Sequence, residues 1–432
     1  MTVPLVTRRR YIPALAALVV FLFFATLYLT DQRTAATNIM FSLGIDAWPF
    51  PFLDADGVVS AARCAREGHD VIYDNPCDPL RRPYNYSPLW LVLAILPVTP
   101  AWLLPVGLIM AFTCIASMLL LPAGRTAGAT TIITLGAISP PMIFAIERAN
   151  TDIAVFVLAA TAALLASWSP AWRLAGYGAA LLAGLLKYYP ITMMVMATRE
   201  RPIRFLAIAA ASIAIVGIFW VTVGDDILRT WQLIPDGGWF NNMMGSRTLP
   251  SGMVAEYKWP TGRADRLLRE LTIAAVVGGI GMSFIPSIRA GLDRLTEAER
   301  MSLLVGSALI ITCFFGARNV GYRVMHLILA LPALTALWRL RASWLFSVTT
   351  FTVLLLLWSQ AWRAHWMRQL FPGRPAFVTV WLVREILWWW TITILIGIVA
   401  ALIARSEMGR RVFRLRSSKV EGRSSKEVQR AS

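Results

Sequence analysis

Long apolar runs recur along the whole chain, and their pattern predicts helices that cross a membrane. Runs such as "IPALAALVVFLFFATLYLT" (12–30) and "TITILIGIVAALIA" (391–404) are apolar on every helical face. A helix of a soluble protein instead carries polar residues along one side. Most of the runs hold about 15 to 22 residues, close to the roughly 20 that a membrane-spanning helix needs.

We therefore predict an all-α polytopic membrane protein with about twelve spans. The spans are expected near 11–29, 101–121, 128–146, 153–168, 174–187, 189–198, 205–222, 270–288, 302–316, 324–338, 343–358 and 382–403. A shorter apolar piece, 88–98, is expected to lie against the membrane surface. The basic start and long apolar core of the first run are typical of an uncleaved signal-anchor helix.

Composition and charge support a membrane protein with one orientation. The chain has 432 residues, of which 57% are hydrophobic, and its net charge is +17. The basic residues flank the spans, as the positive-inside rule expects for a bacterial inner (plasma) membrane, so the charge does not indicate a nucleic-acid partner. The rule predicts cytoplasmic N- and C-termini, and long extracytoplasmic loops at 30–87 and 224–268.

The chain is thus expected to form one transmembrane domain, 1–404. A basic, disordered cytoplasmic tail, 405–432, is expected to follow it. Most of the loop aspartates fall in the long loops, outside the membrane.

The first long loop contains two cysteines in an otherwise polar stretch. Cys64 and Cys77 lie in "AARCAREGHDVIYDNPC", on the oxidising side of the membrane in this topology. We expect a disulfide between them, which for so short a loop stabilises by about 3 kcal/mol. The alternative is a pair of free thiols.

Two carboxylates, Asp54 and Asp56, lie at the start of a helix-like segment of the same loop. A carboxylate at this position can cap the helix and interact favourably with its dipole. It can also act as a general base if other external segments supply complementary groups.

Three other external segments supply such groups. They are "ERANTD" with Glu147, Arg148, Asn150 and Asp152; "LLKYYP" with Lys187 and Tyr188; and "ARNVGYRVMH" with Arg318, Arg323 and His326. The simpler interpretations are a hydrated hairpin for the first segment and a lysine reaching the membrane interface for the second. Arginine and lysine at one surface also suit the binding of a phosphate.

A base for a hydroxyl together with cations for an anionic leaving group fits transfer of a sugar from a lipid-linked phosphosugar. The polar first loop would then form the lid of the site. No metal-ligand spacing stands out in the chain, and no cofactor is predicted.

The motifs "AARC", "YNYSPLWLVLA", "ERANTDIAVF", "GLLKYYP" and "GYR…LILALPAL" follow in an order that resembles the GT-C glycosyltransferases of family 87. These are polyprenyl-phosphate-mannose-dependent α-mannosyltransferases and their bacterial relatives, and the resemblance covers about residues 54–335. It implies a GT-C fold, a long catalytic first loop and inversion at the anomeric carbon. It also implies Asp54 as the catalytic aspartate, with Asp56 as the second candidate.

The resemblance also implies roles for further residues of this chain, which match motifs of the family. Tyr86 and Pro88 match the family's tyrosine–proline pattern, with Ser87 in place of a common proline. Lys187 with Pro190, and separately Asn150, match two other motifs, while the surroundings of His326 depart from the pattern and leave the sugar open. The partners implied are a polyprenyl-phosphate sugar, a glycolipid or glycan acceptor and the lipid bilayer.

Two other classes of function remain open at this stage. A carrier or flippase for a lipid-linked sugar would place ionisable residues at mid-span and show similar halves, and neither is visible here. A non-catalytic scaffold of an envelope assembly would tolerate substitution of Asp54.

Overall fold

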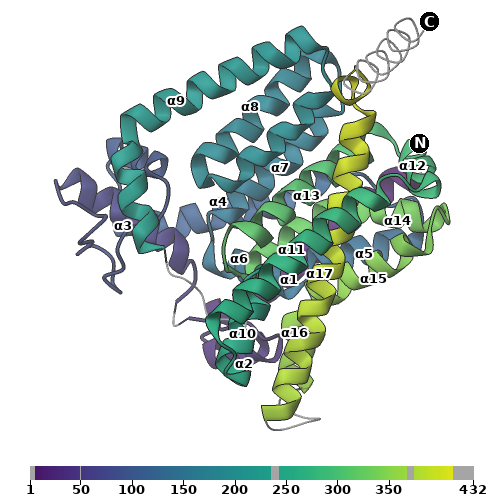
Figure 1. The fold of residues 1–432 in the computed structure, drawn as a ribbon. Helices are drawn as coiled ribbons and strands as arrows, with labels where there is room; N and C mark the ends of the chain where they lie inside the picture. Colours follow the sequence, from purple (N-terminus) through teal and green to yellow (C-terminus); the bar gives the residue numbers. More distant parts are fainter. Residues whose placement is uncertain (1–4, 49, 235–242, 367–373, 412–432) are drawn as a thin grey trace, which may run out of the picture.

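The computed structural model describes residues 5–48, 50–234, 243–366 and 374–411, and helices dominate it (Figure 1). The α-helices up to the middle of the chain are α1 (Leu5–Leu29), α2 (Arg33–Ser42), α3 (Leu53–Arg66), α4 (Leu103–Ser117), α5 (Ala127–Ala137), α6 (Pro140–Arg148), α7 (Asp152–Ala166), α8 (Pro170–Lys187) and α9 (Pro202–Leu233). Those that follow are α10 (Thr248–Tyr257), α11 (Thr261–Met282), α12 (Pro286–Asp293), α13 (Glu297–Gly316), α14 (Leu331–Arg339), α15 (Trp344–Leu357), α16 (Ser359–His365) and α17 (Arg374–Arg405).

Shorter elements connect these helices. The 3₁₀ segments are η1 (Pro88–Ile95), η2 (Pro100–Trp102), η3 (Met118–Leu120), η4 (Tyr189–Arg199) and η5 (Gly321–Ala330). Two short strands, β1 (Met243–Met244) and β2 (Asn319–Val320), pair antiparallel, with Met243 opposite Val320. Of the predicted tail 405–432, residues 412–432 lie outside the described part of the chain.

The prediction of an all-α polytopic membrane protein agrees with the helices observed, but twelve spans are not confirmed. Within the described residues, seven helical stretches are long and apolar enough to cross a membrane. The number rises to nine if two bent pairs, α11 with α12 and α15 with α16, each form one span; the pairs bend by 69° and 64°.

The shortfall comes from the segment between 152 and 199. Helix α7 has only 15 residues because it starts directly after the polar Asn150–Thr151 turn. The predicted span 189–198 is instead the 3₁₀ segment η4 of 11 residues, which at about 2 Å per residue is shorter than the ~30 Å apolar core of a bilayer.

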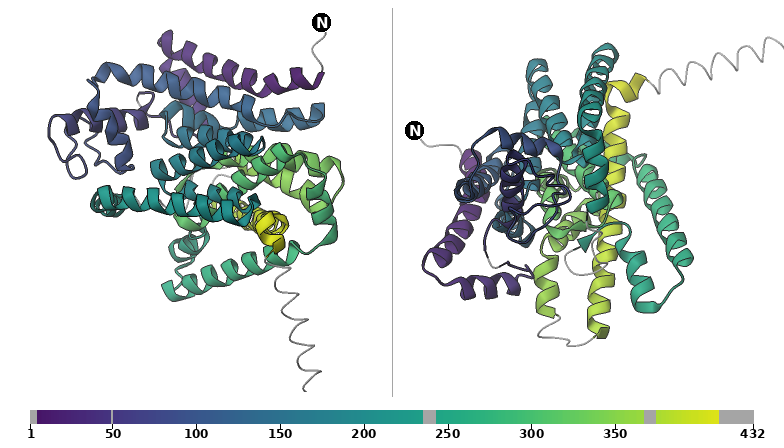
Figure 2. Two further views of the ribbon diagram at one scale, coloured as in Figure 1. Left: turned by 90° about the horizontal axis from the view of Figure 1, so that it is seen from above. Right: turned by 90° about the vertical axis from the view of Figure 1, so that its left-hand side faces the viewer.

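Small residues let the central helices pack closely. A Cβ on Gly176 of α8 would lie 3.0 Å from the Ala162 carbonyl oxygen of α7. A Cβ on Gly397 of α17 would lie 2.8 Å from the Gly279 carbonyl oxygen of α11. Such contacts are typical of helices packed in membranes. Figure 2 shows α1 on one flank of the resulting bundle and α11 on the opposite flank.

Arginines join the helices at one end of the bundle, which we call the arginine-rich end. Arg9 of α1 reaches the Arg125 carbonyl oxygen, and Arg405 of α17 pairs with Asp293 at 2.5 Å. Arg125 in turn donates two hydrogen bonds, from Nε and Nη2, to the Glu299 carboxylate of α13. Glu299 also accepts from the Thr296 backbone N–H at 2.8 Å in a capping box, so a single carboxylate holds both the loop at Arg125 and the start of α13.

We expect Glu299→Gln to lower the stability of the protein more than Glu297→Gln does. The first change removes the charge from a side chain that is 3% exposed, whereas Glu297 is 36% exposed. A hydrogen bond to a charged group contributes about 1.5–3 kcal/mol, and an exposed ion pair contributes less than about 1 kcal/mol. Thermal unfolding midpoints in detergent measure the difference, and equal midpoints for the two variants would contradict this assignment.

At the opposite end, the first long loop folds into a small unit of its own. Helix α3 packs on η1, and Cys64, Val71, Ile72 and Tyr84 form part of its separate apolar core. A disulfide joins Cys64 to Cys77, with 5.8 Å between their Cα atoms. The other two cysteines, Cys114 and Cys313, are buried in helices and free.

Removing the disulfide is expected to loosen this loop without unfolding the membrane helices. Cys64→Ser with Cys77→Ser removes the disulfide, which contributes about 3 kcal/mol to the stability of the folded loop. Limited proteolysis should therefore cleave residues 50–87 roughly a hundredfold faster in the double variant. Cys114→Ala, which removes a thiol outside any disulfide, is the control. Unchanged cleavage in the double variant would show that the disulfide does not stabilise the loop.

Candidate functional site

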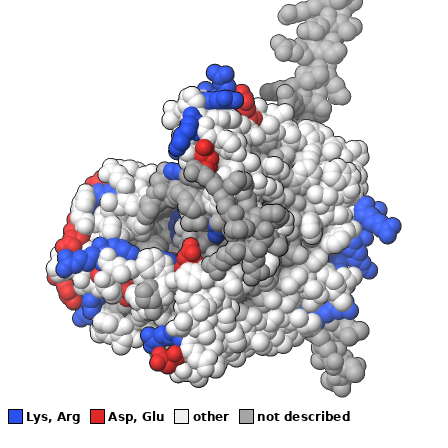
Figure 3. Space-filling view, turned by 90° about the horizontal axis from the view of Figure 1, so that it is seen from below, with Lys and Arg blue, Asp and Glu red and all other residues white. Residues whose placement is uncertain are grey.

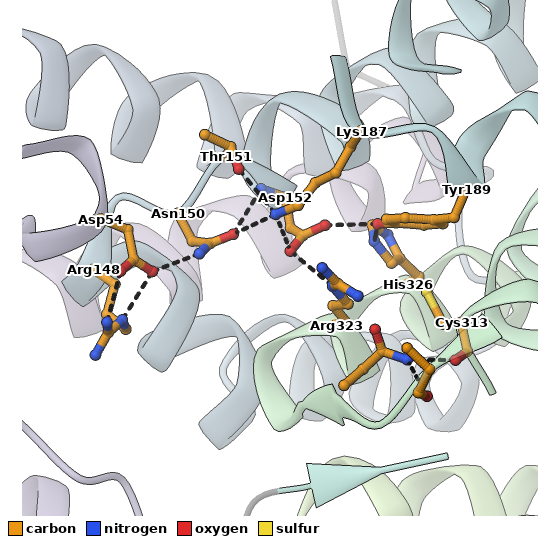
Figure 4. A network of polar contacts seen from close by, with 12 residues as sticks. Asp54, Arg148, Asn150, Thr151, Asp152, Lys187, Tyr189, Cys313, Arg323 and His326 are labelled. Carbon is orange, nitrogen blue, oxygen red and sulfur yellow. Dashed lines mark hydrogen bonds and ion pairs between the residues drawn. The ribbon is translucent and has the colours of Figure 1, made fainter. Parts of the chain in front are cut away.

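Most of the sequence-predicted residues meet at the end of the bundle opposite the arginine-rich end. They come from the start of α3, the turn between α6 and α7, the end of α8, and η5 (Figure 4). Helix α7 fixes the separation of the two ends. Asp152 starts it, and the Ala166 carbonyl oxygen near its other end accepts from Arg199. Fourteen rises of 1.5 Å place the two residues about 21 Å apart.

Asp54 is the first member of a continuous polar network. Its side chain is 6% exposed and receives two hydrogen bonds from Arg148, at 2.6 and 2.8 Å. Asn150 donates a third through Nδ2 at 2.5 Å. The two Asp54 oxygens are not used equally, because Oδ1 accepts only from Arg148 while Oδ2 accepts from both residues. Oδ1 therefore has capacity for one more donor.

Asn150 connects this carboxylate to a second one. Its Oδ1 accepts from the Asp152 backbone N–H at 2.8 Å and from Lys187 Nζ at 3.2 Å. Lys187 also donates to Thr151 Oγ1 at 2.9 Å and to Asp152 Oδ2 at 2.6 Å. An ammonium group has three N–H donors, so all three are in use here. Asp152 is fully buried, so its negative charge requires a cationic partner such as Lys187.

Segments η4 and η5 complete the network from the other side, with Tyr189 at the start of η4 and Arg323 and His326 in η5. Arg323 Nε lies 3.2 Å from Asp152 Oδ2, and the Tyr189 hydroxyl donates to Asp152 Oδ1 at 2.6 Å. His326 Nε2 lies 2.8 Å from the same hydroxyl. Because side chains three residues apart align in a 3₁₀ helix, Arg323 and His326 reach the network together.

Turns with a strained backbone conformation precede several of these side chains in the chain. Phe52, Ala149 and Tyr188 all have positive φ, at 65°, 44° and 61°. They lie just before Asp54, Asn150 and Tyr189 in the chain. A residue other than glycine adopts this conformation at a cost of roughly 1–2 kcal/mol, so the surrounding structure must enforce it. Strain of this kind is concentrated at functional sites.

The network carries a surplus of positive charge. Arg148, Lys187 and Arg323 face the carboxylates of Asp54 and Asp152, which leaves one positive charge in excess. Figure 3 looks onto this end of the molecule and shows a hollow with Lys or Arg atoms inside it. Arg323 retains 21% exposure of its side chain and Lys187 11%. The site can therefore attract an anion.

Asp56 faces away from this network. Two residues on a helix turn its side chain by about 200° relative to Asp54, toward Arg82 at 3.9 Å. Arg82 also binds Asp78 at 2.8 Å and the Leu53 carbonyl oxygen at 3.0 Å, which ties the loop to α3. Burial and the nearby Asp78 carboxylate raise the pKa of Asp56, and Arg82 partly offsets them.

Glu147 and Tyr86 border the network on different sides. Lys187 Nζ lies 5.7 Å from the centre of the Tyr86 ring, in cation–π range. Glu147 is 6% exposed, and neither carboxylate oxygen has a hydrogen-bond partner among the described residues. The Trp48 backbone N–H approaches this carboxylate without reaching hydrogen-bond geometry.

Like Asp56, two further sequence-predicted residues are not brought into the network. The Tyr188 hydroxyl lies near Ser87 and Thr230, because the chain turns at this residue. Arg318 donates to Ser251 Oγ of α10 at 3.2 Å.

Tyr189 and Thr151 belong to the network but were not among the residues predicted from the sequence. The repeated tyrosine in "KYYP" did indicate an aromatic hydroxyl here, but only the turn selects the second of the two.

One group of side chains in the described part of the chain has the proximity of metal ligands: Cys64, Glu67 and His69. The disulfide occupies the Cys64 sulfur. Two exposed side chains on one loop are therefore all that remains, and they do not form a metal site.

Comparisons with known proteins return no similarity from which to assign the chain. No protein-family model, no curated protein and no solved structure matches it.

Proposed function

We propose that this protein transfers a sugar from a polyprenyl-phosphate sugar to a hydroxyl of a glycolipid or glycan. One observation carries the proposal: the Asp54 carboxylate and the Lys187 and Arg323 cations belong to a single buried network at the helix ends. A hydroxyl acceptor needs a base, and a departing phosphate needs cations. A polyprenyl tail stays in the bilayer, so the reaction belongs where helices meet a membrane surface.

Asp54 is the proposed base. The acceptor oxygen attacks the anomeric carbon while Asp54 takes its proton, and the bond from that carbon to the phosphate oxygen breaks. Attack from the face opposite the phosphate inverts the anomeric configuration. Arg148 and Asn150 hold the carboxylate in a fixed orientation, and the unused capacity of Asp54 Oδ1 supports a contact with the acceptor hydroxyl.

Arg323 and Lys187 are the proposed phosphate ligands. Arg323 is the more exposed of the two and uses Nε for Asp152, so its terminal nitrogens suit phosphate oxygens. Lys187 would exchange one of its three acceptors for the phosphate. Tyr189 donates to the other Asp152 oxygen, and His326 positions the Tyr189 hydroxyl. The cations take up the charge that grows on the polyprenyl phosphate as it leaves.

The position of the network also supports an enzyme over a carrier. A carrier binds its cargo near mid-membrane, between similar halves. Here the ionisable network lies at the helix ends opposite the arginine-rich end. By the positive-inside rule, the proposed site faces the extracytoplasmic side of a bacterial plasma membrane, and both termini are cytoplasmic.

The test is transfer of radiolabelled sugar in membranes that contain the protein. Polyprenyl-phospho-mannose is the first donor, followed by other polyprenyl-phospho-sugars, and membranes without the protein are the control. We expect protein-dependent incorporation into lipid or glycan. Labelling of single cysteines introduced at exposed positions of the first loop, such as Arg66→Cys, tests the orientation. No incorporation from any donor, or a first loop labelled only from the cytoplasm, would contradict the proposal.

A further inference from the structure

A cavity of about 300 Å³ lies between α1, α4 and α6, next to the network but outside it. Helix α2 and the Pro51–Phe52 turn close one end. The lining is apolar apart from two side chains, Tyr28 and Glu147. Leu29 and Leu104 also line it and are 88% and 61% exposed, so the cavity opens sideways between α1 and α4. Both helices belong to stretches apolar enough to span a membrane, so the opening faces lipid.

The two polar groups of this cavity lack partners. The Tyr28 hydroxyl and both Glu147 oxygens are buried, and no described residue makes a hydrogen bond of full geometry with them, although the Trp48 backbone N–H approaches the Glu147 carboxylate. An unpaired buried polar group costs roughly 1–3 kcal/mol, and an unpaired carboxylate costs more. A native structure rarely retains such groups without a ligand or water. Since a carboxylate is an acceptor, Glu147 needs a ligand that donates hydrogen bonds.

The same end of the cavity adjoins the proposed base. The Phe52 backbone N–H donates to the Glu147 carbonyl oxygen at 2.6 Å, which joins α3 to α6. Asp54 lies two residues after Phe52, and Arg148, its partner, follows Glu147 directly. A Cβ on Gly107 of α4 would overlap the Phe52 ring, so this ring is fixed between the cavity and α4.

We propose that the cavity holds the hydrocarbon chain of the acceptor, and that the acceptor is therefore a lipid with a hydroxyl-bearing, non-anionic head. Glu147 and Tyr28 hold the head, and one of its hydroxyls extends to Asp54. The inference rests on the proposed function. The phosphate donor does not suit this cavity, because Glu147 repels a phosphate, whereas the Lys187 and Arg323 side attracts one. Donor and acceptor thus approach Asp54 from opposite sides.

Photolabelling of the full-length protein in lipid nanodiscs tests whether the cavity binds a lipid with a non-anionic head. The probes are dodecyl maltoside and dodecyl phosphate, each with a diazirine in the chain, used at about pH 8, where carboxyl groups are normally ionised. We expect the maltoside probe to label α1 and α6 about tenfold more than the phosphate probe, which is about 1.4 kcal/mol. Glu147→Gln should reduce this preference to less than about threefold. Equal labelling by both probes in the unaltered protein would overturn the inference.

A substitution that fills the cavity provides the second arm. Ala25→Trp places an indole in the cavity, and Thr26→Trp places the same group on the exposed face of the same helix. We expect Ala25→Trp alone to lower labelling by the maltoside probe about tenfold. Unchanged labelling in Ala25→Trp would overturn the proposed position of the chain.

Sugar transfer separates this inference from the proposed function. Ala25→Trp should lower transfer into the lipid fraction, and Thr26→Trp should not. Transfer that persists in Ala25→Trp would overturn the lipid acceptor while sustaining the glycosyltransferase. Labelling needs no catalysis, so a protein that binds the maltoside probe but never transfers sugar would overturn the proposed function itself.

Discussion

Asp54→Asn is expected to reduce sugar transfer by a factor of roughly 10²–10⁴, the usual contribution of a general base. The amide cannot take up the proton of the acceptor hydroxyl. Its NH₂ group would also face the donors of Arg148 and Asn150, which now bind the carboxylate. The measurement is incorporation of radiolabelled sugar in membranes with equal amounts of each protein.

Asp56→Asn is the matched control for this substitution. The residue lies two positions further along the same helix and points to Arg82 instead of the network. This variant should therefore retain most of the activity. Donor affinity separates a base from a structural role. Loss of a base lowers the turnover rate and leaves the KM for the donor nearly unchanged. Full activity in Asp54→Asn would eliminate the proposed base.

Lys187→Met is expected to abolish transfer and also to destabilise the protein, by about 3–5 kcal/mol. The lysine supplies three hydrogen bonds to the α6–α7 turn, and Asp152 has no exposed surface through which water could replace them. Lys258→Met is the matched control, because Lys258 caps α10 from an exposed position. The measurements are the thermal unfolding midpoint in detergent and the transfer rate.

A double variant separates the two effects of Lys187. Asp152→Asn added to Lys187→Met removes the buried negative charge together with its partner. We expect it to recover at least half of the lost stability but none of the transfer, because a phosphate-facing cation is still missing. Recovery of transfer in the double variant would show that Lys187 serves only to neutralise Asp152.

The pattern of apolar residues along the chain was sufficient to predict several of the membrane-spanning helices. Apolar runs predicted α1, α9, α13 and α17, because a helix in lipid must be apolar on all sides whatever its neighbours are. The same argument failed for α7 and η4. These segments lie among other helices, and their lengths are set by the turns that deliver Asn150 and Tyr189. The predicted number of spans was therefore larger than the structure supports.

The candidate site could be predicted only in part. The polar groups of "ERANTD" and "LLKYYP" stood out against their apolar surroundings, and the structure brings Asp54, Arg148, Asn150, Asp152 and Lys187 together. The choice between Asp54 and Asp56, and between Tyr188 and Tyr189, depends on which way each side chain points. The sequence does not show which of two neighbouring residues of the same type points into the site.

By itself, the sequence determined that this chain is an α-helical membrane protein and which helix ends carry polar chemistry. Both properties follow from the cost of moving single residues out of water, which is a local quantity. Only the tertiary structure decided that Asp54 faces Arg148, that Lys187 is shared with Asp152, and that Glu147 lacks a partner beside an apolar cavity. These facts depend on contacts between segments up to 94 residues apart, and the strained turns that establish them are maintained by the packing of the whole bundle.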